Sequence, residues 1–432
     1  MIEIINKIFW ATATFFIVIS SIYFTLKLDF IQFHFKRMLK NLFKKTETNG
    51  IKPYQTLMMV LAGRIGVGSI AGVALAIYLG GIGSIFWMWV IGFLSATNSF
   101  AETVLGIIYK EKDEGDIYKG GPSYYIKNGL GFKKLGGMYA IIVIISYVFG
   151  FLSIQSNTIT KSINQITNVS PIIIGIIIVI LTYIIIFGGI KTIAATTSKL
   201  VPFMTIGYIG IAIYICMVNI NLIPNILISI IKDAFKLRPF LSGFLATLII
   251  GVQRGIFSNE AGLGTGAIAS SAVSTNDAVG QGYLQMIGVY ITTMLICTST
   301  AIIILTSPYE SINILDINGI EITQFSFKYH LGDIGNYLIF LSIILFSFST
   351  ILTGYYDGEA SLKYFFNNVK KKYLFLLKIF TLIILFIGCI ISSQLLWDIV
   401  DIMVAIEALI NIYALISLRK VVTREYSTYN IK

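Results

Sequence analysis

The sequence predicts an all-α, polytopic membrane protein with eleven transmembrane helices, forming a single transporter-type domain over residues 1–432. Two observations predict this fold class. Of the 432 residues, 56% are hydrophobic and only 12% are charged, whereas a soluble domain carries about a quarter charged residues. The hydrophobic residues also gather in runs close to the ~20 residues that a helix needs to cross the hydrocarbon core.

The eleven runs follow one another along almost the whole chain. The first, at 8–26, is too long for the apolar region of a signal peptide and has no small-residue cleavage site after it, so we expect a permanent helix. The other ten runs lie near 54–79, 83–109, 137–165, 171–188, 200–219, 241–269, 280–306, 333–355, 373–392 and 395–418.

Basic residues indicate the orientation of these helices. With the N-terminus outside, the odd number of spans places the C-terminus in the cytoplasm. Most lysines and arginines then lie in the inside loops, at 27–52, 110–134, 191–199, 363–378 and 419–432, as the positive-inside rule requires. The net charge of +11 is therefore explained by topology. We expect a lipid bilayer as the partner, no nucleic acid and no obligate protein partner.

Two apolar runs are interrupted by glycine-rich segments, at 61–72 and 253–264, and each segment carries an arginine, Arg64 or Arg254. A helix breaks at membrane depth only where protein or a wet cavity surrounds the break. Two such breaks, far apart in sequence, are typical of a secondary transporter with a site at mid-membrane. Each break opens a set of five spans, at 54–219 and 241–418. Because five is odd, the sets form an inverted repeat behind the extra first helix.

The first interruption contains Gly66, Val67, Gly68 and Ser69. It superficially matches a dinucleotide-binding fingerprint, but no strand can precede it inside a helical span. We interpret it as an unwound helix. A second half-helix starting near Ser69 offers free N–H groups to a carboxylate, and the carbonyls that end the first half suit a sodium ion. The alternative is that the glycines only allow close helix packing.

The second interruption carries more side-chain chemistry. Phe257 can shape a small apolar pocket, while Ser258 and Asn259 offer hydroxyl and amide groups to a small zwitterion. Glu260 is an ionisable group at membrane depth, which is a functional hypothesis by default. The alternative for Glu260 is a structural ion pair with Arg64 or Arg254.

Other polar residues lie in otherwise apolar spans. Hydroxyl groups at Ser347, Ser349, Thr350 and Thr353 suit a weak cation site, although Ser and Thr also bond back to their own helix. Gln155 and Asn157 occur together in the fourth span. We interpret Glu102, Asp357, Glu359 and Glu407 as interfacial charges or gate ion pairs. Cys216, Cys297 and Cys389 have no metal-ligand spacing, so we expect no cofactor and no metal except sodium.

In these motifs the sequence resembles the alanine/glycine:cation symporter family of bacterial and archaeal carriers. The similar segments run in the family's order over roughly residues 50–415. They are 68–77, 86–89, 120–126, Gln155 with Asn157, 201–204, 254–264, 346–350 and 357–359. The segment 254–264 is the most specific of them. Gly120, Gly121 and Pro122 also predict the start of a short helix at the inner mouth.

The resemblance implies a LeuT-like fold, alternating access and sodium-driven uptake of alanine, glycine or a similar small amino acid across a prokaryotic cell membrane. It implies substrate contacts at Gly66, Val67, Gly68, Gln155, Phe257, Ser258 and Asn259, with Ser69 and Tyr355 at positions where the family usually has Asn and Trp. It implies a sodium site at the carbonyls of Ala62 and Ile65 with Ser349 and Thr350. Arg64, Arg254 and Glu260 are then structural or gating residues.

The sequence also departs from the family at Thr292 and Ser123, where Asp and Met are usual. Three functions other than sodium-driven uptake remain as alternatives. One is a proton-coupled carrier of another small amino acid, and a second is a transceptor that binds an amino acid with little flux. The third is a membrane enzyme, which two histidines and the absence of ligand-spaced cysteines disfavour. We therefore predict a transporter and not an enzyme.

Overall fold

The computed structural model describes residues 2–43, 50–113, 116–164, 167–236, 241–311, 319–366, 369–391 and 394–431. Lys44 and Lys45 of the first predicted inside loop, and the span ends predicted at 165 and 392, lie outside the described residues.

The described chain is almost entirely helical. Its α-helices are α1 (Ile2–Lys27), α2 (Phe35–Leu42), α3 (Pro53–Arg64), α4 (Ala71–Gly80), α5 (Ser84–Ile108), α6 (Pro122–Leu130), α7 (Lys133–Val143), α8 (Leu152–Asn164), α9 (Pro171–Phe187), α10 (Gly189–Val218), α11 (Ile223–Ala234), α12 (Leu241–Asn259), α13 (Thr265–Ser271), α14 (Ala278–Tyr290), α15 (Thr298–Leu305), α16 (Ile320–Lys363), α17 (Lys371–Ile390), α18 (Gln394–Ser417) and α19 (Arg419–Ile431). The short strands β1 (Glu111–Lys112) and β2 (Tyr118–Lys119) pair antiparallel, with Glu111 opposite Lys119.

Eight described helical segments are long and apolar enough to cross a bilayer: Ile4–Lys27, Ser84–Ile108, Lys133–Asn164, Gly189–Val218, Ala278–Leu305, Ile320–Lys363, Lys371–Ile390 and Trp397–Ser417. The three other predicted ranges are also helical. The ranges 54–79 and 241–269 are each divided into two helices, and α9 has 17 residues. The protein is therefore a helical polytopic membrane protein.

Several local features were not predicted in this form. Two long helical segments contain π-helical turns, η3 (Ile144–Phe151) and η4 (Ile291–Cys297). The helix α16 begins at Ile320 and kinks at Gly332, whose φ is 60°. The kink coincides with the predicted span start at 333. The short helix α6 begins at Pro122 as predicted, directly after Gly121 with φ of 103°.

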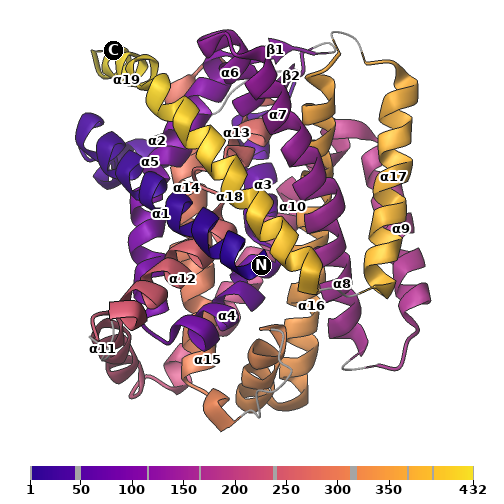
Figure 1. Ribbon diagram of the computed structural model, residues 1–432. Helices are drawn as coiled ribbons and strands as arrows, with labels where there is room; N and C mark the ends of the chain where they lie inside the picture. The colour runs from indigo at the N-terminus through magenta and orange to yellow at the C-terminus, as the bar shows by residue number, and fades with distance from the viewer. Residues whose placement is uncertain are drawn as a thin grey trace.

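The breaks of the two divided helices lie inside the molecule (Figure 1), since the residues around each break are buried. The strands, α6 and α19 lie at one end, and α11 and α15 lie at the other. The helices α9 and α17 pack together at one side, while α1 lies along α18 and α5. The short helix α4 and its partner α3 are thus surrounded by protein, which is the condition under which a bilayer tolerates a break.

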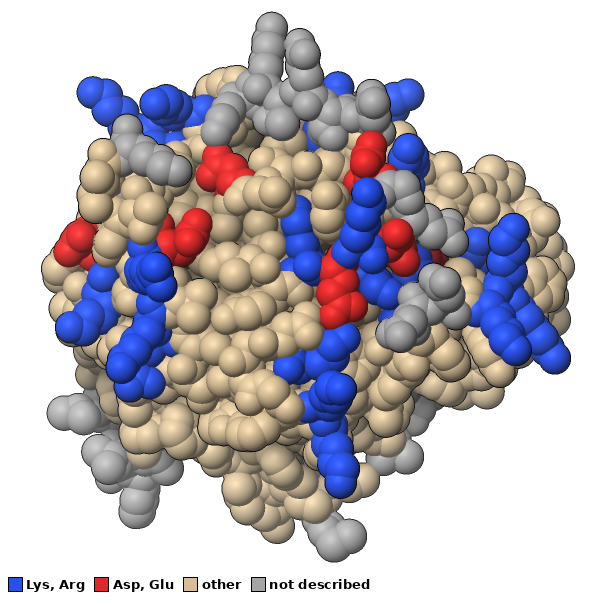
Figure 2. All heavy atoms as spheres, turned by 90° about the horizontal axis from the view of Figure 1, so that it is seen from above, with Lys and Arg blue, Asp and Glu red and all other residues tan. Residues whose placement is uncertain are grey.

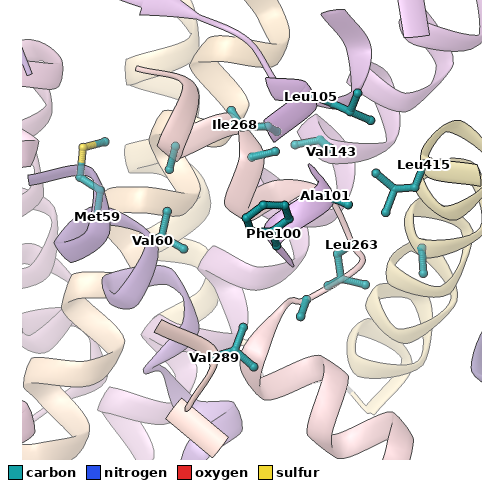
Figure 3. Packing of buried hydrophobic residues seen from close by; sticks show 14 of the residues in the cluster. Met59, Val60, Phe100, Ala101, Leu105, Val143, Leu263, Ile268, Val289 and Leu415 are labelled. Carbon is teal, nitrogen blue, oxygen red and sulfur yellow. The ribbon is translucent and has the colours of Figure 1, made fainter. Parts of the chain in front are cut away.

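Buried apolar side chains join the central helices near the second division (Figure 3). Val60 from α3, Phe100 from α5 and Leu415 from α18 belong to one buried cluster with Leu263, which lies in the non-helical connection between α12 and α13. This packing holds the connection at a fixed place in the core.

Candidate functional site

The first predicted break is present at the end of α3. The helix ends at Arg64, Gly66 is extended with φ of −118° and ψ of −155°, and one 3-10 turn over Val67–Ser69 precedes α4. The helix α4 begins at Ala71, two residues after the expected start near Ser69. The interpretation as an unwound helix is therefore confirmed for the backbone, with a short 3-10 turn filling the gap.

The second break is also present, but it is shorter than the glycine pattern indicates. The helix α12 continues to Asn259, and the chain then leaves helical geometry at Glu260, Gly262 and Gly264, with φ of 55°, 96° and 95°. Gly255 stays helical, and a Cβ there would lie 2.7 Å from Ile91 Cγ2. The close-packing alternative is therefore correct for Gly255, while Gly262 and Gly264 supply the left-handed backbone that glycine allows.

The two breaks meet through small polar groups. The hydroxyls of Ser69 and Ser258 are 2.8 Å apart, and Ser258 lies 3.1 Å from the Cys297 thiol. Thr300 donates to the Ser69 carbonyl at 2.9 Å. These four side chains are buried, so the structure places Ser69 and Ser258 together as one polar cluster. Cys297 was not predicted at this site, because no sequence spacing links it to Ser258.

Aromatic rings border this cluster. Phe257 stacks on Phe151 with centroids 5.1 Å apart, and Phe151 stacks on Tyr147 at 4.6 Å. A Cβ on Gly68 would lie 3.2 Å from Phe257 Cδ1. The absence of a side chain at Gly68 therefore lets the ring approach the backbone.

Gln155 and Thr350 lie against the other side of the first break. A Cβ on Gly66 would lie 2.5 Å from Thr350 Oγ1 and 3.2 Å from Gln155 Nε2. Gln155 is 2% exposed, and its Oε1 atom has no hydrogen-bond partner within the described ranges. Asn157 instead donates to the carbonyl of Gly388 in α17 and to that of Ile391, directly after α17. Of the two amides, only Gln155 lies near the first break.

The hydroxyls of α16 reach a carbonyl at the end of α3. Thr350 donates to the Ala62 carbonyl at 2.9 Å, Ser349 donates to the same oxygen at 3.3 Å, and both also bond back to Phe346. Carbonyl and hydroxyl oxygens are hard ligands of the type that a small alkali cation accepts. The donor set near Ala62 therefore fits a weakly held sodium ion, with Ile65 buried one turn later at the helix end.

Asn259 and Tyr355 have protein partners of their own. Asn259 donates to Thr293 at 3.0 Å and accepts from the Ala261 N–H at 2.9 Å, which caps the end of α12. Tyr355 donates to Glu359 at 2.5 Å, and Glu359 pairs with Lys363 at 2.9 Å. Both residues are buried. Asn259 organises the second break, whereas Tyr355 binds a residue one turn further along α16.

The two arginines form ion pairs, but not with Glu260, the partner that the sequence suggested. Arg64 lies 4.0 Å from Glu102, and Arg254 lies 3.3 Å from Asp401. Glu260 accepts hydrogen bonds from Tyr147 at 2.8 Å and Thr265 at 3.0 Å. The ion pair considered for Glu260 is therefore replaced by neutral donors, because helices distant in sequence supply the carboxylates that the arginines need.

Comparisons with known proteins agree with this architecture. A model of the sodium:alanine symporter family matches residues 1–432. A probable sodium/glutamine symporter, GlnT of Bacillus subtilis, is 36% identical over 99% of this chain and 90% of its own length. The sodium/alanine symporter AgcS of Methanococcus maripaludis is 32% identical over 100% of this chain and 97% of its own length.

A crystal structure of a manganese transporter from Eremococcus coleocola has a TM-score of 0.58 to this structure. The match covers 85% of this chain and 78% of that one at 10% identity, so it bears on the fold alone. The whole-chain family match and the relatives above 30% identity carry the assignment. The chain belongs to the sodium:alanine symporter family.

Proposed function

We propose that this chain is a secondary active transporter that couples sodium entry to the uptake of alanine, glycine or a similar small neutral amino acid by alternating access. The observation that carries the proposal is the meeting of the two helix breaks, with hydroxyls of α16 on the Ala62 carbonyl and Ser69 beside Ser258. A broken helix offers backbone carbonyls to a cation and backbone N–H groups to a carboxylate at the same depth.

The proposed substrate contacts are Gly66, Val67, Gly68, Ser69, Gln155, Phe257, Ser258, Asn259 and Tyr355. Among them, the free Oε1 of Gln155 supports a contact with the substrate ammonium group. Phe257 and the bare backbone of Gly68 support a small side chain, because little space separates them. Sodium is proposed at Ala62, Ile65, Ser349 and Thr350, with oxygen ligands only.

For the membrane topology we propose eleven spans in a LeuT-like layout of five plus five inverted helices behind α1. The helical segments in all eleven predicted ranges support it, as does the position of a broken helix at the start of each set. We propose an outside N-terminus and a cytoplasmic C-terminus. In Figure 2, lysine and arginine side chains predominate over acidic ones on the end that carries β1, β2 and α6, which supports a cytoplasmic location for that end.

Uptake in proteoliposomes tests the proposal. We expect labelled alanine or glycine to accumulate when an inward sodium gradient is applied, and to stop accumulating when choline replaces sodium. Uptake that ignores sodium but follows a proton gradient would identify the proton-coupled carrier instead. Saturable amino acid binding without accumulation would identify a transceptor.

A further inference from the structure

Among the described residues, three buried acidic side chains form no ion pair: Glu260, Asp357 and Glu407. Glu260 instead accepts hydrogen bonds from Tyr147 and Thr265. The other buried carboxylates are paired, since Glu102 faces Arg64, Asp401 faces Arg254 and Glu359 faces Lys363. Asp357 on α16 is 4% exposed and Glu407 on α18 is 0% exposed. Within the described part of the chain, neither forms an ion pair, so their charge is not balanced by a neighbouring cation.

Two consecutive residues bind Glu407 and Glu260. Glu407 accepts a hydrogen bond from Ser146, and the adjacent Tyr147 donates to Glu260 at 2.8 Å. Because Ser146 and Tyr147 belong to one π-helical turn, the two carboxyl groups they bind flank the same short segment.

Asp357 reaches the same region from α16. A Cβ on Gly63 would lie 3.3 Å from Thr353 Oγ1 and 3.6 Å from Glu260 Oε2, so Thr353 is beside Glu260. Asp357 follows Thr353 by four residues and therefore shares its helix face. A Cβ on Gly354 would lie 3.5 Å from Tyr147 Cδ1, and one on Gly358 would meet Val148 Cγ2. The part of α16 that carries Asp357 therefore packs against the π-helical turn whose Ser146 binds Glu407.

Both carboxyl groups have an oxygen with nothing to bind. Asp357 Oδ1 and Glu407 Oε2 are buried and have no hydrogen-bond partner among the described residues. A buried, unpaired carboxylate is expensive, and a group in that situation takes up a proton rather than remain charged. A second carboxyl group packed against the same π-helical turn adds to this cost, because a like charge in a medium of low dielectric constant disfavours ionisation further.

We propose that Asp357 and Glu407 form a proton-binding site, separate from the proposed sodium site, that holds at least one proton in this conformation. The titratable groups around it are Glu260 from the second break, Tyr139 from α7, Tyr147 from η3 and Tyr356 on α16. A single proton can satisfy one of the two oxygens that lack a partner. Within the described ranges, no group of three or more acidic, histidine or cysteine residues has an arrangement suited to a metal.

The site lies along α16 from the proposed sodium ligands. Asp357 follows Thr350 by seven residues, which is about 10 Å at 1.5 Å per residue, toward the end that carries β1 and β2. Its link to transport rests on the proposed function. An alternating-access movement that lets water reach the pair would allow the proton to leave, and transport would then depend on pH as well as on sodium.

Infrared spectroscopy of the full chain in lipid tests the site directly. We expect a carbonyl band from a protonated carboxylic acid at neutral pH, which shifts in heavy water and is lost in Asp357→Asn or Glu407→Gln. Both substitutions keep the size of the side chain. The matched control is Glu359→Gln, on the same helix, which removes a carboxyl paired with Lys363 and should leave the band unchanged.

A wild-type spectrum without this band would overturn the proposal, as would a band that survives in both variants. A sodium titration needs no variant. The band should persist at saturating sodium, and its loss on sodium addition would identify a second metal site instead of a proton site. These measurements do not involve transport. If the band is assigned to Asp357 and Glu407 but the protein shows no uptake, the proton site stands and only the proposed function is refuted.

Discussion

The two helix breaks are built differently, although both interrupt a helix at the same depth of the core. At the first break, the carbonyl of Ala62 accepts a hydrogen bond from a threonine hydroxyl of α16, and that of Ser69 accepts one from a threonine hydroxyl of α15. At the second break, the Gly262 N–H donates to Glu102 at 3.1 Å and its carbonyl accepts from Asn411 at 2.9 Å. The first break is held by hydroxyls, and the second is held by charged and amide groups.

This difference assigns different tasks to the two breaks. A hydroxyl can rotate away from a carbonyl when a cation arrives, so the first break is suited to reversible ion binding. A carboxylate bonded to a buried N–H has no equivalent freedom, and Glu260 holds a left-handed backbone conformation that costs a non-glycine residue about 1–2 kcal/mol. The second break therefore acts as a rigid support. Four predictions test this contrast, in order of decreasing expected effect.

Removal of the Glu102 carboxylate should have the largest effect. Glu102→Ala leaves Arg64 buried without its acidic partner and frees the Gly262 N–H, so we expect a loss of about 3–5 kcal/mol of folding free energy. Thermal unfolding of the purified protein in detergent measures it. The matched control is Asp401→Ala at the more exposed Arg254 pair, and an equal or larger loss there would contradict the special role of Glu102.

Gly264→Ala should destabilise the second break next. Gly264 has φ of 95°, and a Cβ there would lie 2.3 Å from Pro122 Cγ, so we expect a loss of about 2 kcal/mol or more. The control Gly207→Ala lies within α10 with no atom within 4 Å of the new Cβ, and it should be neutral or stabilising by up to about 1 kcal/mol. Similar melting temperatures for the two variants would argue against a strained second break.

Asn259→Ala should stop transport while the protein still inserts. Its amide joins the end of α12 to Thr293 and to the Ala261 N–H, so its loss moves the second break relative to Ser258. Uptake in proteoliposomes and the amount of protein in the membrane should be measured together. The control Asn157→Ala removes an amide directed at α17 and should retain uptake. Wild-type uptake by Asn259→Ala would refute the assignment of Asn259 to the site.

Thr350→Val should affect sodium rather than folding. The substitution removes the hydroxyl that contacts the Ala62 carbonyl. A hydrogen-bonding group of this kind contributes about 1 kcal/mol. We therefore expect a several-fold rise in the sodium concentration that gives half-maximal uptake. Thr350→Ser should restore the wild-type value. The control Thr381→Val removes a buried hydroxyl that has no partner among the described residues. An unchanged sodium dependence in Thr350→Val would show that Thr350 is not a sodium ligand.

The sequence predicts the existence of both breaks because glycines cluster inside apolar runs. It does not predict their exact positions. Gly255 serves close packing against α5, while Glu260, which is not a glycine, adopts the left-handed conformation. Only tertiary contacts distinguish these cases, since Tyr147 and Thr265 satisfy the Glu260 carboxylate where it leaves the helix.

The side-chain partners were harder to predict than the helices. Arg64 and Glu102 are 38 positions apart in the printed sequence, and no periodic pattern joins them. The sequence predicts Asp357 and Glu407, like Glu102 and Glu359, as interfacial charges or gate ion pairs, because a carboxylate near a span end is usually solvated or paired. The packing of α16 and α18 against η3 buries both instead.

A density map of the full chain in lipid with sodium and alanine tests the central claim most directly. The account predicts amino acid density between the first break at 66–69 and the second at 257–259, and an ion beside Ala62 and Thr350. Continuous helices through both segments, or a ligand bound elsewhere, would contradict it.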